Sequence, residues 1–265
     1  MGKIIRRIIM AILLVIFVGS VAMIVHTRMS YRAGELIYEK SAQQFAAAQP
    51  TPTGAETMES GGEPAEAEEL APITVDFEAL QTVNPQVVGW IYCEDTVVNY
   101  PVVQGTDDSY YLKHAYDGSA SSNGSIFVEV ENAPDFTDVN TVIYGHNMKN
   151  RTMFGTLEDW AQQDYYEAHP VFWLLTPERD YKIQLFSGYT TSGGSDAYML
   201  FPEPGEELNE YLQESVEKSD FFSNVMTPED GKYVLLSTCA YTFSNARYVL
   251  HGRLIPVDSA GGVQK

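Results

Sequence analysis

The sequence predicts a mostly β domain that follows an N-terminal transmembrane helix. Two observations predict the domain. Short runs rich in Val, Ile, Tyr and Phe recur from residue 87 onward, and Gly, Pro, Asn and Asp interrupt them at short intervals. Many short strands separated by turn signals indicate a barrel or a sandwich. A third observation, an uncharged apolar run at residues 8–25, predicts the membrane helix.

The apolar run reads IIMAILLVIFVGSVAMIV and is just long enough to cross a bilayer as a helix. Three basic residues among the first seven precede it, so the positive-inside rule places the N-terminus in the cytoplasm and the rest outside. A cleaved signal peptide, with a small-residue site at 20–22, is the alternative. Because the run continues past that site, we favour an uncleaved, single-pass signal-anchor over residues 1–27, with residues 8–25 in the cell membrane.

Residues 28–72 separate the anchor from the strand-rich part of the chain. The first part, 28–48, is helix-prone and mixed in charge. The second part, 49–72, holds four prolines, three glycines and six glutamates without a Lys or Arg, which predicts a disordered, self-repelling linker. We interpret it as a spacer that holds the domain off the membrane. One domain is expected at 73–258, followed by a disordered tail at 259–265.

The expected elements of this domain follow in chain order. Asp76 caps a short helix that runs through Leu80. One further helix stands out at 203–220, where apolar residues recur at helical spacing and Lys218 near the end complements the helix dipole. A shorter helix is expected at 155–168. The runs with strand composition are 87–104, 124–132, 140–147, 169–177, 181–192, 232–239 and 248–257.

The net charge bears on the possible partners. The chain has 16 basic and 36 acidic residues, and residues 1–40 are net basic, so the remainder is more acidic than the total of −20. Such a surface repels phosphate backbones, and no nucleic-acid partner is expected. It would also be repelled by anionic lipid headgroups unless something tethers it to the membrane, as the apolar run would.

The chain has only two cysteines, Cys93 and Cys239. A scaffold stapled by disulfides would need more, although one disulfide between them remains possible. Cys93 lies in a strand pattern near Trp90, which favours a buried, inert thiol. Histidines and cysteines are too few and lack ligand spacing, so neither a metal site nor a cofactor is expected.

Cys239 is the candidate nucleophile. It ends the apolar run 232–239, and a strand end holds a side chain rigidly while leaving it accessible. Arg247 begins the next strand-like run, and antiparallel pairing across the intervening turn would bring its guanidinium next to the sulfur. There it can stabilise a thiolate or an oxyanion and hold a substrate carbonyl.

A cysteine nucleophile also needs a proton acceptor, and the chain has five histidines. His146 ends an apolar strand beside Gly and Asn, which suits a catalytic imidazole. His26 borders the membrane run, and His114 and His169 stand in loop-like contexts. Spacing alone does not separate His146 from His251, which lies within the final strand.

The combined pattern resembles a class B sortase. The motif Leu236-Ser237-Thr238-Cys239 at a strand end, followed by an Arg and preceded by an upstream His, matches the family signature, with Leu235 in place of the usual first Thr. The resemblance covers about residues 75–256. It is carried in order by NPQVVGWIYCEDTVVNYPVVQGTDDSYYL, GSIFVEVEN, NTVIYGHNMKNRTMFGTL and ARYVLHGRL.

This resemblance implies a closed β-barrel of about eight strands, with an N-terminal helix and a helix inserted before the Cys strand. It implies that Cys239 is the nucleophile, His146 the general acid/base, and Arg247 the residue that orients the substrate and stabilises the oxyanion. Ser237 and Thr238 would line the substrate groove. Because the thiol and the imidazole must each hold one protonation state, we expect a bell-shaped pH–rate profile.

The implied reaction is transpeptidation at the outer face of the cell membrane. The enzyme would cleave a C-terminal sorting signal of an exported protein, hold the protein as a thioacyl enzyme, and pass it to an amine of a lipid-linked peptidoglycan precursor. The residues alone leave two alternatives open. One is a cysteine hydrolase or protease with water as acceptor. The other is a non-catalytic extracellular binding module in which Cys239 is structural or bonded to Cys93.

Overall fold

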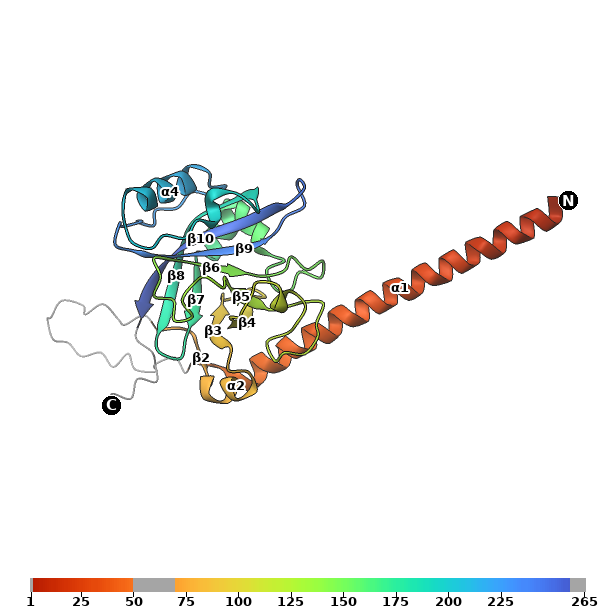
Figure 1. Cartoon of the computed structure of the whole chain (residues 1–265), viewed down its shortest axis with the longest axis horizontal. Helices are drawn as coiled ribbons and strands as arrows, with labels where there is room; N and C mark the ends of the chain where they lie inside the picture. Colours follow the sequence, from red (N-terminus) through yellow and green to blue (C-terminus); the bar gives the residue numbers. More distant parts are fainter. Residues whose placement is uncertain (1, 50–69, 258–265) are drawn as a thin grey trace, which may run out of the picture.

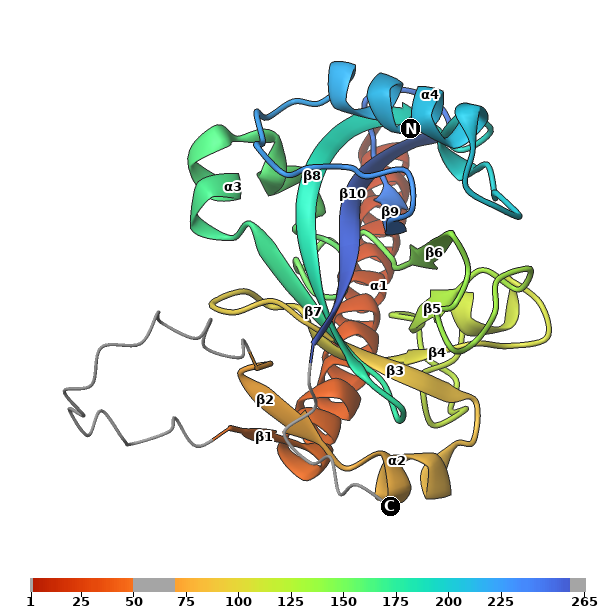
Figure 2. The same ribbon diagram turned by 90° about the vertical axis from the view of Figure 1, so that its left-hand side faces the viewer.

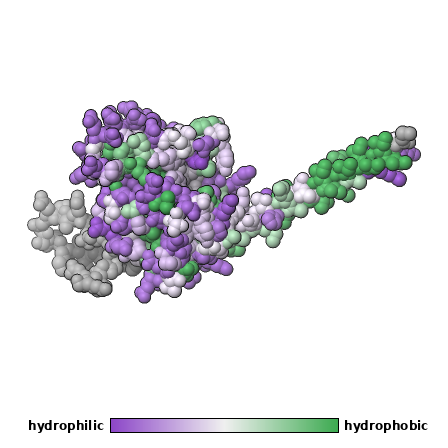
Figure 3. Space-filling model, viewed as in Figure 1, coloured by the Kyte–Doolittle hydropathy of each residue, from purple (hydrophilic) through white to green (hydrophobic). Residues whose placement is uncertain are grey.

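One long helix, α1 (Gly2–Phe45), joins the apolar N-terminal segment to the strand-rich domain (Figure 1). The computed structural model describes residues 2–49 and 70–257. The helix is apolar and long enough to cross a membrane, and none of its most apolar window is buried. Figure 3 shows these apolar side chains gathered on the part of the helix that projects away from the domain. Such a helix is consistent with a membrane anchor or a signal sequence.

The second half of α1 packs against the domain, where Gly34, Tyr38, Ser41 and Phe45 are buried. Directly after it, β1 (Ala46–Ala48) pairs antiparallel with β2 (Ile73–Val75). This pairing brings the two ends of the segment between them together. α1 itself leads directly to the barrel, and the interpretation of residues 49–72 as a spacer stays a prediction because most of that segment lies outside the described residues.

Two predicted segments fall outside the described residues. Residues 50–69 form most of the acidic Pro/Gly/Glu linker, and residues 258–265 include the predicted disordered tail. Their expected disorder stays a prediction.

The domain is a closed barrel of eight strands, with the order β10-β8-β7-β3-β4-β5-β6-β9. All neighbours are antiparallel except the pairs β4–β5 and β6–β9, which are parallel. The predicted fold class is confirmed. The strands are β3 (Val87–Tyr92), β4 (Asn99–Val103), β5 (Ile126–Val128), β6 (Asn140–Tyr144), β7 (Val171–Leu175), β8 (Asp180–Ser192), β9 (Lys232–Cys239) and β10 (Ala246–Val257).

Two helices match their sequence signals. The side chain of Asp76 accepts a hydrogen bond of 3.0 Å from the backbone N–H of Ala79, which caps α2 (Phe77–Val83) as predicted. α4 (Glu206–Glu217) buries Leu208 and Leu212 and lies before β9 in the chain. Figure 2 shows α4 and α2 at opposite ends of the barrel. The remaining helices are the short η1 (Tyr110–Leu112), η2 (Leu157–Ala161), α3 (Gln163–Ala168) and η3 (Asp196–Tyr198).

Two predicted elements are divided in the structure. The expected strand 87–104 is two strands, because Asp95 takes a positive φ of 56° and Thr96 Oγ1 donates to the carbonyl of Cys93, which makes a turn. The expected helix 155–168 is η2 followed by α3. It breaks at Gln162, whose backbone is extended (φ −94°, ψ 125°). Both breaks depend on backbone angles that residue patterns specify weakly.

The barrel core is apolar and aromatic. Trp90, Trp160, Phe154 and Leu236 are fully buried. A second cluster lies between α4 and the barrel wall, where Phe186 and Tyr233 pack with Leu208 and Leu212. This packing fixes β8, β9 and β10, and with them the strand ends from which the candidate site is built.

Candidate active site

The strand pair β9–β10 places Cys239 opposite Arg247. Their Cα atoms are partners in the antiparallel register, as are those of Ser237 and Val249. The expectation that the two strands pair across the turn is therefore confirmed. Because each residue lies at the end of its strand, both side chains are only partly covered by the barrel.

His146 lies two residues beyond β6, which runs parallel to β9. Three hydrogen bonds hold this segment against β9. Gly145 N donates to Ser237 O at 3.0 Å, Thr238 Oγ1 donates to Gly145 O at 2.8 Å, and Asn147 Nδ2 donates to Cys239 O at 2.6 Å. The chain on both sides of His146 is thus fixed to the strand that carries the thiol.

The imidazole of His146 is itself oriented by the backbone. Its Nε2 lies 2.8 Å from the carbonyl oxygen of Leu112. A carbonyl only accepts, so this nitrogen carries the proton and Nδ1 is left as the proton acceptor of the neutral ring. Gly124 makes room for the ring, because a Cβ there would lie 2.7 Å from His146 Cδ2. Its φ of +58° also favours glycine.

All five sequence-predicted site residues line one pocket of about 300 Å³. It opens where β5, β6, β9 and β10 end near the turn that follows β8. The lining residues are Asp108, Leu112, Phe127, Tyr144, Gly145, His146, Gly193, Tyr198, Ser237, Thr238, Cys239 and Arg247. Residues from distant parts of the sequence therefore meet around a single cavity that contains a thiol, an imidazole and a guanidinium.

The guanidinium of Arg247 is uncrowded, and its charge can act on a ligand in the pocket. Its Nη1 donates to Ala246 O at 3.0 Å. Gly193 faces it, and a Cβ at that position would lie 3.3 Å from Arg247 Cζ. None of the ion pairs found in residues 2–49 and 70–257 includes Arg247. The remaining donors of the guanidinium can therefore serve a ligand in the pocket.

Ser237 and Thr238 are buried and already hydrogen-bonded within the protein. Ser237 Oγ and Tyr198 OH share a hydrogen bond of 2.7 Å, and Thr238 Oγ1 binds the carbonyl of Gly145. Their side chains thus hold the pocket wall together. Burial raises the pKa of Tyr198, so its hydroxyl stays protonated at neutral pH.

A polar cluster forms another part of the wall. Tyr144 OH donates to Glu129 Oε2 at 2.7 Å, and the ring of Tyr144 stacks on that of Tyr198 with centroids 6.1 Å apart. Burial, and then the neighbouring carboxyl of Glu129, raise the pKa of Asp108 to about 6. The pocket therefore has a cation, Arg247, at one point of its wall and the Asp108 carboxyl, with Glu129 beside it, at another.

Sequence reasoning missed several of these residues. Leu112 acts through its backbone carbonyl, which no side-chain pattern reveals. Tyr144 and Tyr198 look like ordinary strand and loop aromatics in the sequence. Asn147, which directly follows His146, was the one missed residue that the sequence could have revealed. A polar side chain at a strand end, beside a candidate base, can hydrogen-bond that segment to the neighbouring strand.

The competing residues lie elsewhere. His251 is fully buried under α4, where burial lowers its pKa to about 3. His114 stacks on Tyr110 at a centroid distance of 3.9 Å and does not line the pocket. Both cysteines are free thiols. Cys93 is buried, and burial raises its pKa to about 12. The Cys93–Cys239 disulfide of the binding-module alternative is therefore absent.

Chemically, the pocket suits acyl transfer. A thiol can attack a carbonyl carbon, an imidazole can carry a proton, and a guanidinium can stabilise the oxyanion that forms. No group of three or more His, Cys, Asp and Glu residues placed to hold a metal ion occurs in the described ranges.

Comparison with known proteins leads to the same chemistry. The sortase domain family matches residues 91–255. Sortase B from Listeria monocytogenes is 36% identical over 185 residues, which cover 68% of this chain and 74% of the relative. A sortase B–substrate complex from Staphylococcus aureus has a TM-score of 0.65 at 32% identity and covers 69% of this chain and 85% of that chain. Sortase B from B. anthracis, in complex with AAEK1, has a TM-score of 0.69 at 28% identity, with 86% and 99% covered.

Proposed function

Because this chain belongs to the sortase B family of cysteine transpeptidases, we propose that it joins exported proteins to the cell wall. It would cleave a C-terminal sorting signal through a thioacyl intermediate on Cys239 and transfer the protein to an amine of a cell-wall precursor. The observation that carries this proposal is the pairing of Cys239 with Arg247 in a pocket that also contains His146.

In the first half-reaction, Cys239 attacks as a thiolate while His146 holds the proton. The new bond joins Sγ to the carbonyl carbon of the scissile peptide, and the oxyanion accepts hydrogen bonds from Arg247. The C–N bond then breaks as His146 gives its proton to the leaving amine. The exported protein remains as a thioester on Cys239.

In the second half-reaction, the acceptor amine attacks the thioester carbon. Its proton passes to His146, and Cys239 leaves as a thiolate, which restores the starting state. The hydrogen bond from His146 Nε2 to Leu112 O supports this role, because it leaves Nδ1 as the one ring nitrogen that exchanges a proton. Ser237 and Thr238 would shape the groove that holds the sorting signal.

We also propose that α1 is an uncleaved anchor that keeps the domain outside the cell membrane. The basic residues that precede the apolar run support this orientation. The second half of the same helix is packed into the domain, so the anchor and the catalytic domain, assigned to residues 73–258, are parts of one continuous structure. The exported protein and a lipid-linked acceptor would meet at this membrane face.

The test uses the full chain in detergent micelles with a panel of sorting-signal peptides. Mass spectrometry is expected to find a thioacyl adduct on Cys239 and, when an amine is added, a product joined to that amine. Cys239→Ala is the control. Cleavage that yields only hydrolysed product in excess amine would favour a hydrolase. The absence of an adduct with every peptide would contradict the proposal.

A further inference from the structure

The loop that follows His146 lies against α1 where the apolar run ends. A hollow of about 540 Å³ lies between the two, and side chains from both α1 and the loop line it. The lining residues are Met23, Ile24, Thr27, Arg28, Tyr31, Lys149 and Asn150. Met23 and Ile24 belong to the apolar run 8–25. The loop 147–153 is therefore level with the outer end of the segment that we propose crosses the membrane.

The domain is fixed at this height by direct contacts with α1. Ser30 Oγ lies 2.8 Å from Ser122 Oγ, and the Tyr38 hydroxyl donates to the carbonyl of Gly124. From Val25 to Gly34, where the helix packs against the domain, α1 rises only about 14 Å. An anchor that crosses the bilayer would thus place the rim of the pocket at the lipid surface.

The turn between β9 and β10 adds exposed aromatic side chains to the same face. Tyr241 is 72% exposed and Phe243 is 51% exposed. Tyr241 OH lies 3.4 Å from Asn147 O, which connects this turn to the loop after His146. Figure 1 shows the β9–β10 hairpin pointing to the side from which the N-terminal half of α1 projects. Aromatic side chains with one polar end are enriched at membrane–water interfaces.

The charge of this face differs from that of the whole protein. The chain has a net charge of −20, yet neither 147–153 nor 240–245 contains an acidic residue. The loop carries Lys149, which is exposed, and Arg151, which pairs with Asp159. The repulsion from anionic headgroups expected of the acidic domain therefore does not apply here, because a cation near such a surface is attracted to it.

We propose that residues 147–153 and 240–245, together called the lipid rim, dock onto the outer surface of a phospholipid bilayer with anionic headgroups. Tyr241 and Phe243 enter the interface, and Lys149 lies among the phosphates. The inference rests on the membrane anchor of the proposed function. It goes further in that the active-site pocket opens directly at the lipid surface, where an acceptor held in the membrane reaches the thioester without leaving the bilayer.

The test places the full chain in vesicles of phosphatidylcholine and phosphatidylglycerol and measures tryptophan quenching by brominated acyl chains. The variant is Phe243→Trp. Its matched control is Met226→Trp, at a residue 76% exposed that lines a different hollow beside Arg253. After subtraction of the parent spectrum, the emission of Phe243→Trp is expected to fall about twofold, as for a ring at the interface. Emission of Met226→Trp is expected not to change.

Two further arms identify the cause and separate this proposal from the function on which it rests. Omission of phosphatidylglycerol, or Lys149→Gln, is expected to reduce the quenching of Phe243→Trp, since both remove an attraction between headgroups and the rim. Flotation of the vesicles reports the anchor independently. If the chain floats with the vesicles but Phe243→Trp is quenched no more than Met226→Trp, the rim proposal is overturned and the anchor stands. If the chain does not float, both are overturned.

A double variant, Tyr241→Ser with Phe243→Ser, tests the functional consequence. With a soluble sorting peptide it is expected to form the thioacyl adduct at the parent rate, since neither side chain lines the pocket. Transfer to an amine on a lipid headgroup is expected to be about tenfold slower, because the thioester is less often held at the surface. Equal slowing of both reactions would contradict docking and indicate a general loss of structure.

Discussion

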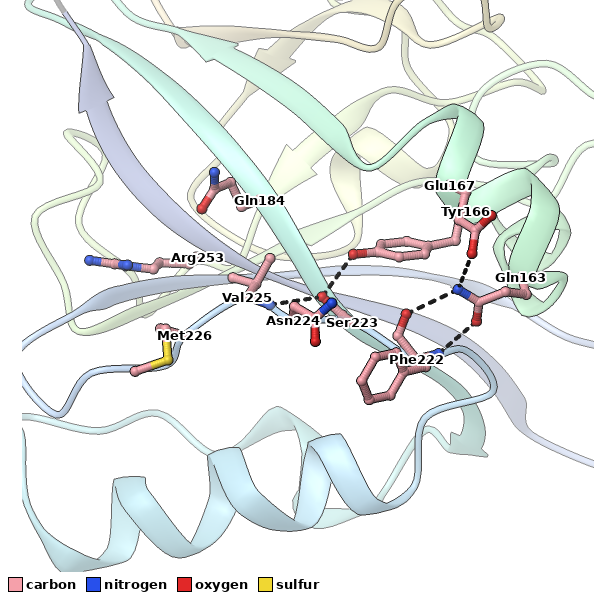
Figure 4. A pocket seen from close by; sticks show the side chains of 10 residues that line it. All are labelled: Gln163, Tyr166, Glu167, Gln184, Phe222, Ser223, Asn224, Val225, Met226 and Arg253. Atoms are coloured by element: carbon pink, nitrogen blue, oxygen red, sulfur yellow. Dashed lines mark hydrogen bonds between the residues drawn. The ribbon is translucent and has the colours of Figure 1, made fainter. Parts of the chain in front are cut away.

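Two hollows on the same barrel differ in size and in what they can do. The pocket at Cys239 has a volume of about 300 Å³, whereas a groove beside α3, β8 and β10 has about 490 Å³ (Figure 4). β10 contributes an arginine to each, Arg247 to the pocket and Arg253 to the groove. Neither the volume of the hollow nor the presence of an arginine therefore distinguishes the pocket at Cys239 from the groove.

The difference lies in how the polar groups are satisfied. In the groove, the Gln163 side chain bonds to both backbone groups of Phe222, and Tyr166 OH donates to Ser223 Oγ, as Figure 4 shows. These bonds hold the segment after α4 against α3. In the pocket, Cys239 and Arg247 form the last β9–β10 pair of the ladder, and strand pairing stops beside their side chains. The thiol and the guanidinium are available to a ligand because strand pairing stops beside them. Substitutions in the pocket and in the groove can test this difference.

The largest expected effect is at Cys239, the proposed nucleophile. Cys239→Ala is expected to abolish the thioacyl adduct, because no other thiol is accessible: the remaining cysteine, Cys93, is buried. Cys93→Ala is the matched control and should retain the adduct, while lowering stability by about 1–2 kcal/mol through the small cavity that it creates. Mass spectrometry and thermal unfolding measure the two effects. Adduct formation by Cys239→Ala would assign the nucleophile to a different residue.

The two arginines of β10 give the next test. Arg247→Gln is expected to lower kcat/KM by about 100-fold or more, because Arg247 is the proposed oxyanion donor and losing such a donor usually costs that much. Arg253→Gln, in the larger groove, should change kcat/KM by less than about twofold because it is remote from the thiol. Steady-state kinetics with a fluorogenic sorting peptide compares them. Comparable losses in both variants would show that the groove takes part in the reaction.

A third test displaces the imidazole without changing it. Gly124→Ala forces a Cβ into His146 and strains a backbone with φ of +58°, and we expect kcat to fall by about 100-fold through misplacement of the ring. Gly194→Ala is the control, since a Cβ there meets nothing within 4 Å. Normal activity would show that the position of His146 is not critical.

Much of this arrangement was predictable from the sequence. Strand composition with turn signals predicted a mostly β domain, either a barrel or a sandwich, and the resemblance to class B sortases implied the closed barrel. The positions of Cys239 and Arg247 at the ends of neighbouring strand-like runs predicted that the two residues pair. The parts that were missed depend on backbone placement. Leu112 contributes only its backbone carbonyl to the site. Gly124 leaves room for the imidazole because it has no side chain. The packing of α1 on the barrel was missed because two of its four buried residues, Gly34 and Ser41, are small or polar, so the contact face does not read as an apolar stripe.

His251 lies on β10 between Arg247 and Arg253, in the buried middle of the strand. It allows the effect of burial on the pH dependence of stability to be measured. Burial lowers its pKa to about 3, well below the unfolded value near 6.5, so the unfolded state binds more protons between those values. Stability should therefore fall as pH drops from about 6.5 toward 3, by up to about 1.4 kcal/mol per pH unit. Denaturant unfolding of His251→Phe should show a weaker pH dependence, and His114→Gln should match the parent. An unchanged slope in His251→Phe would exclude this residue as the source.

The smallest expected effect concerns the carboxyl on the pocket wall. Burial and Glu129 raise the pKa of Asp108 to about 6, so the folded state binds a proton more tightly than the unfolded chain. Stability from this group is then highest below about pH 4 and declines as pH rises through about 6. Asp108→Asn is expected to raise Tm slightly at pH 7.5 and to leave it unchanged near pH 4, because the like-charge repulsion exists only when both carboxyls are ionised. Glu167→Gln in the larger groove serves as control. A Tm gain of equal size at both pH values would mean that the substitution acts through packing, and that the carboxyl pair does not make the pocket wall electrostatically different from the groove.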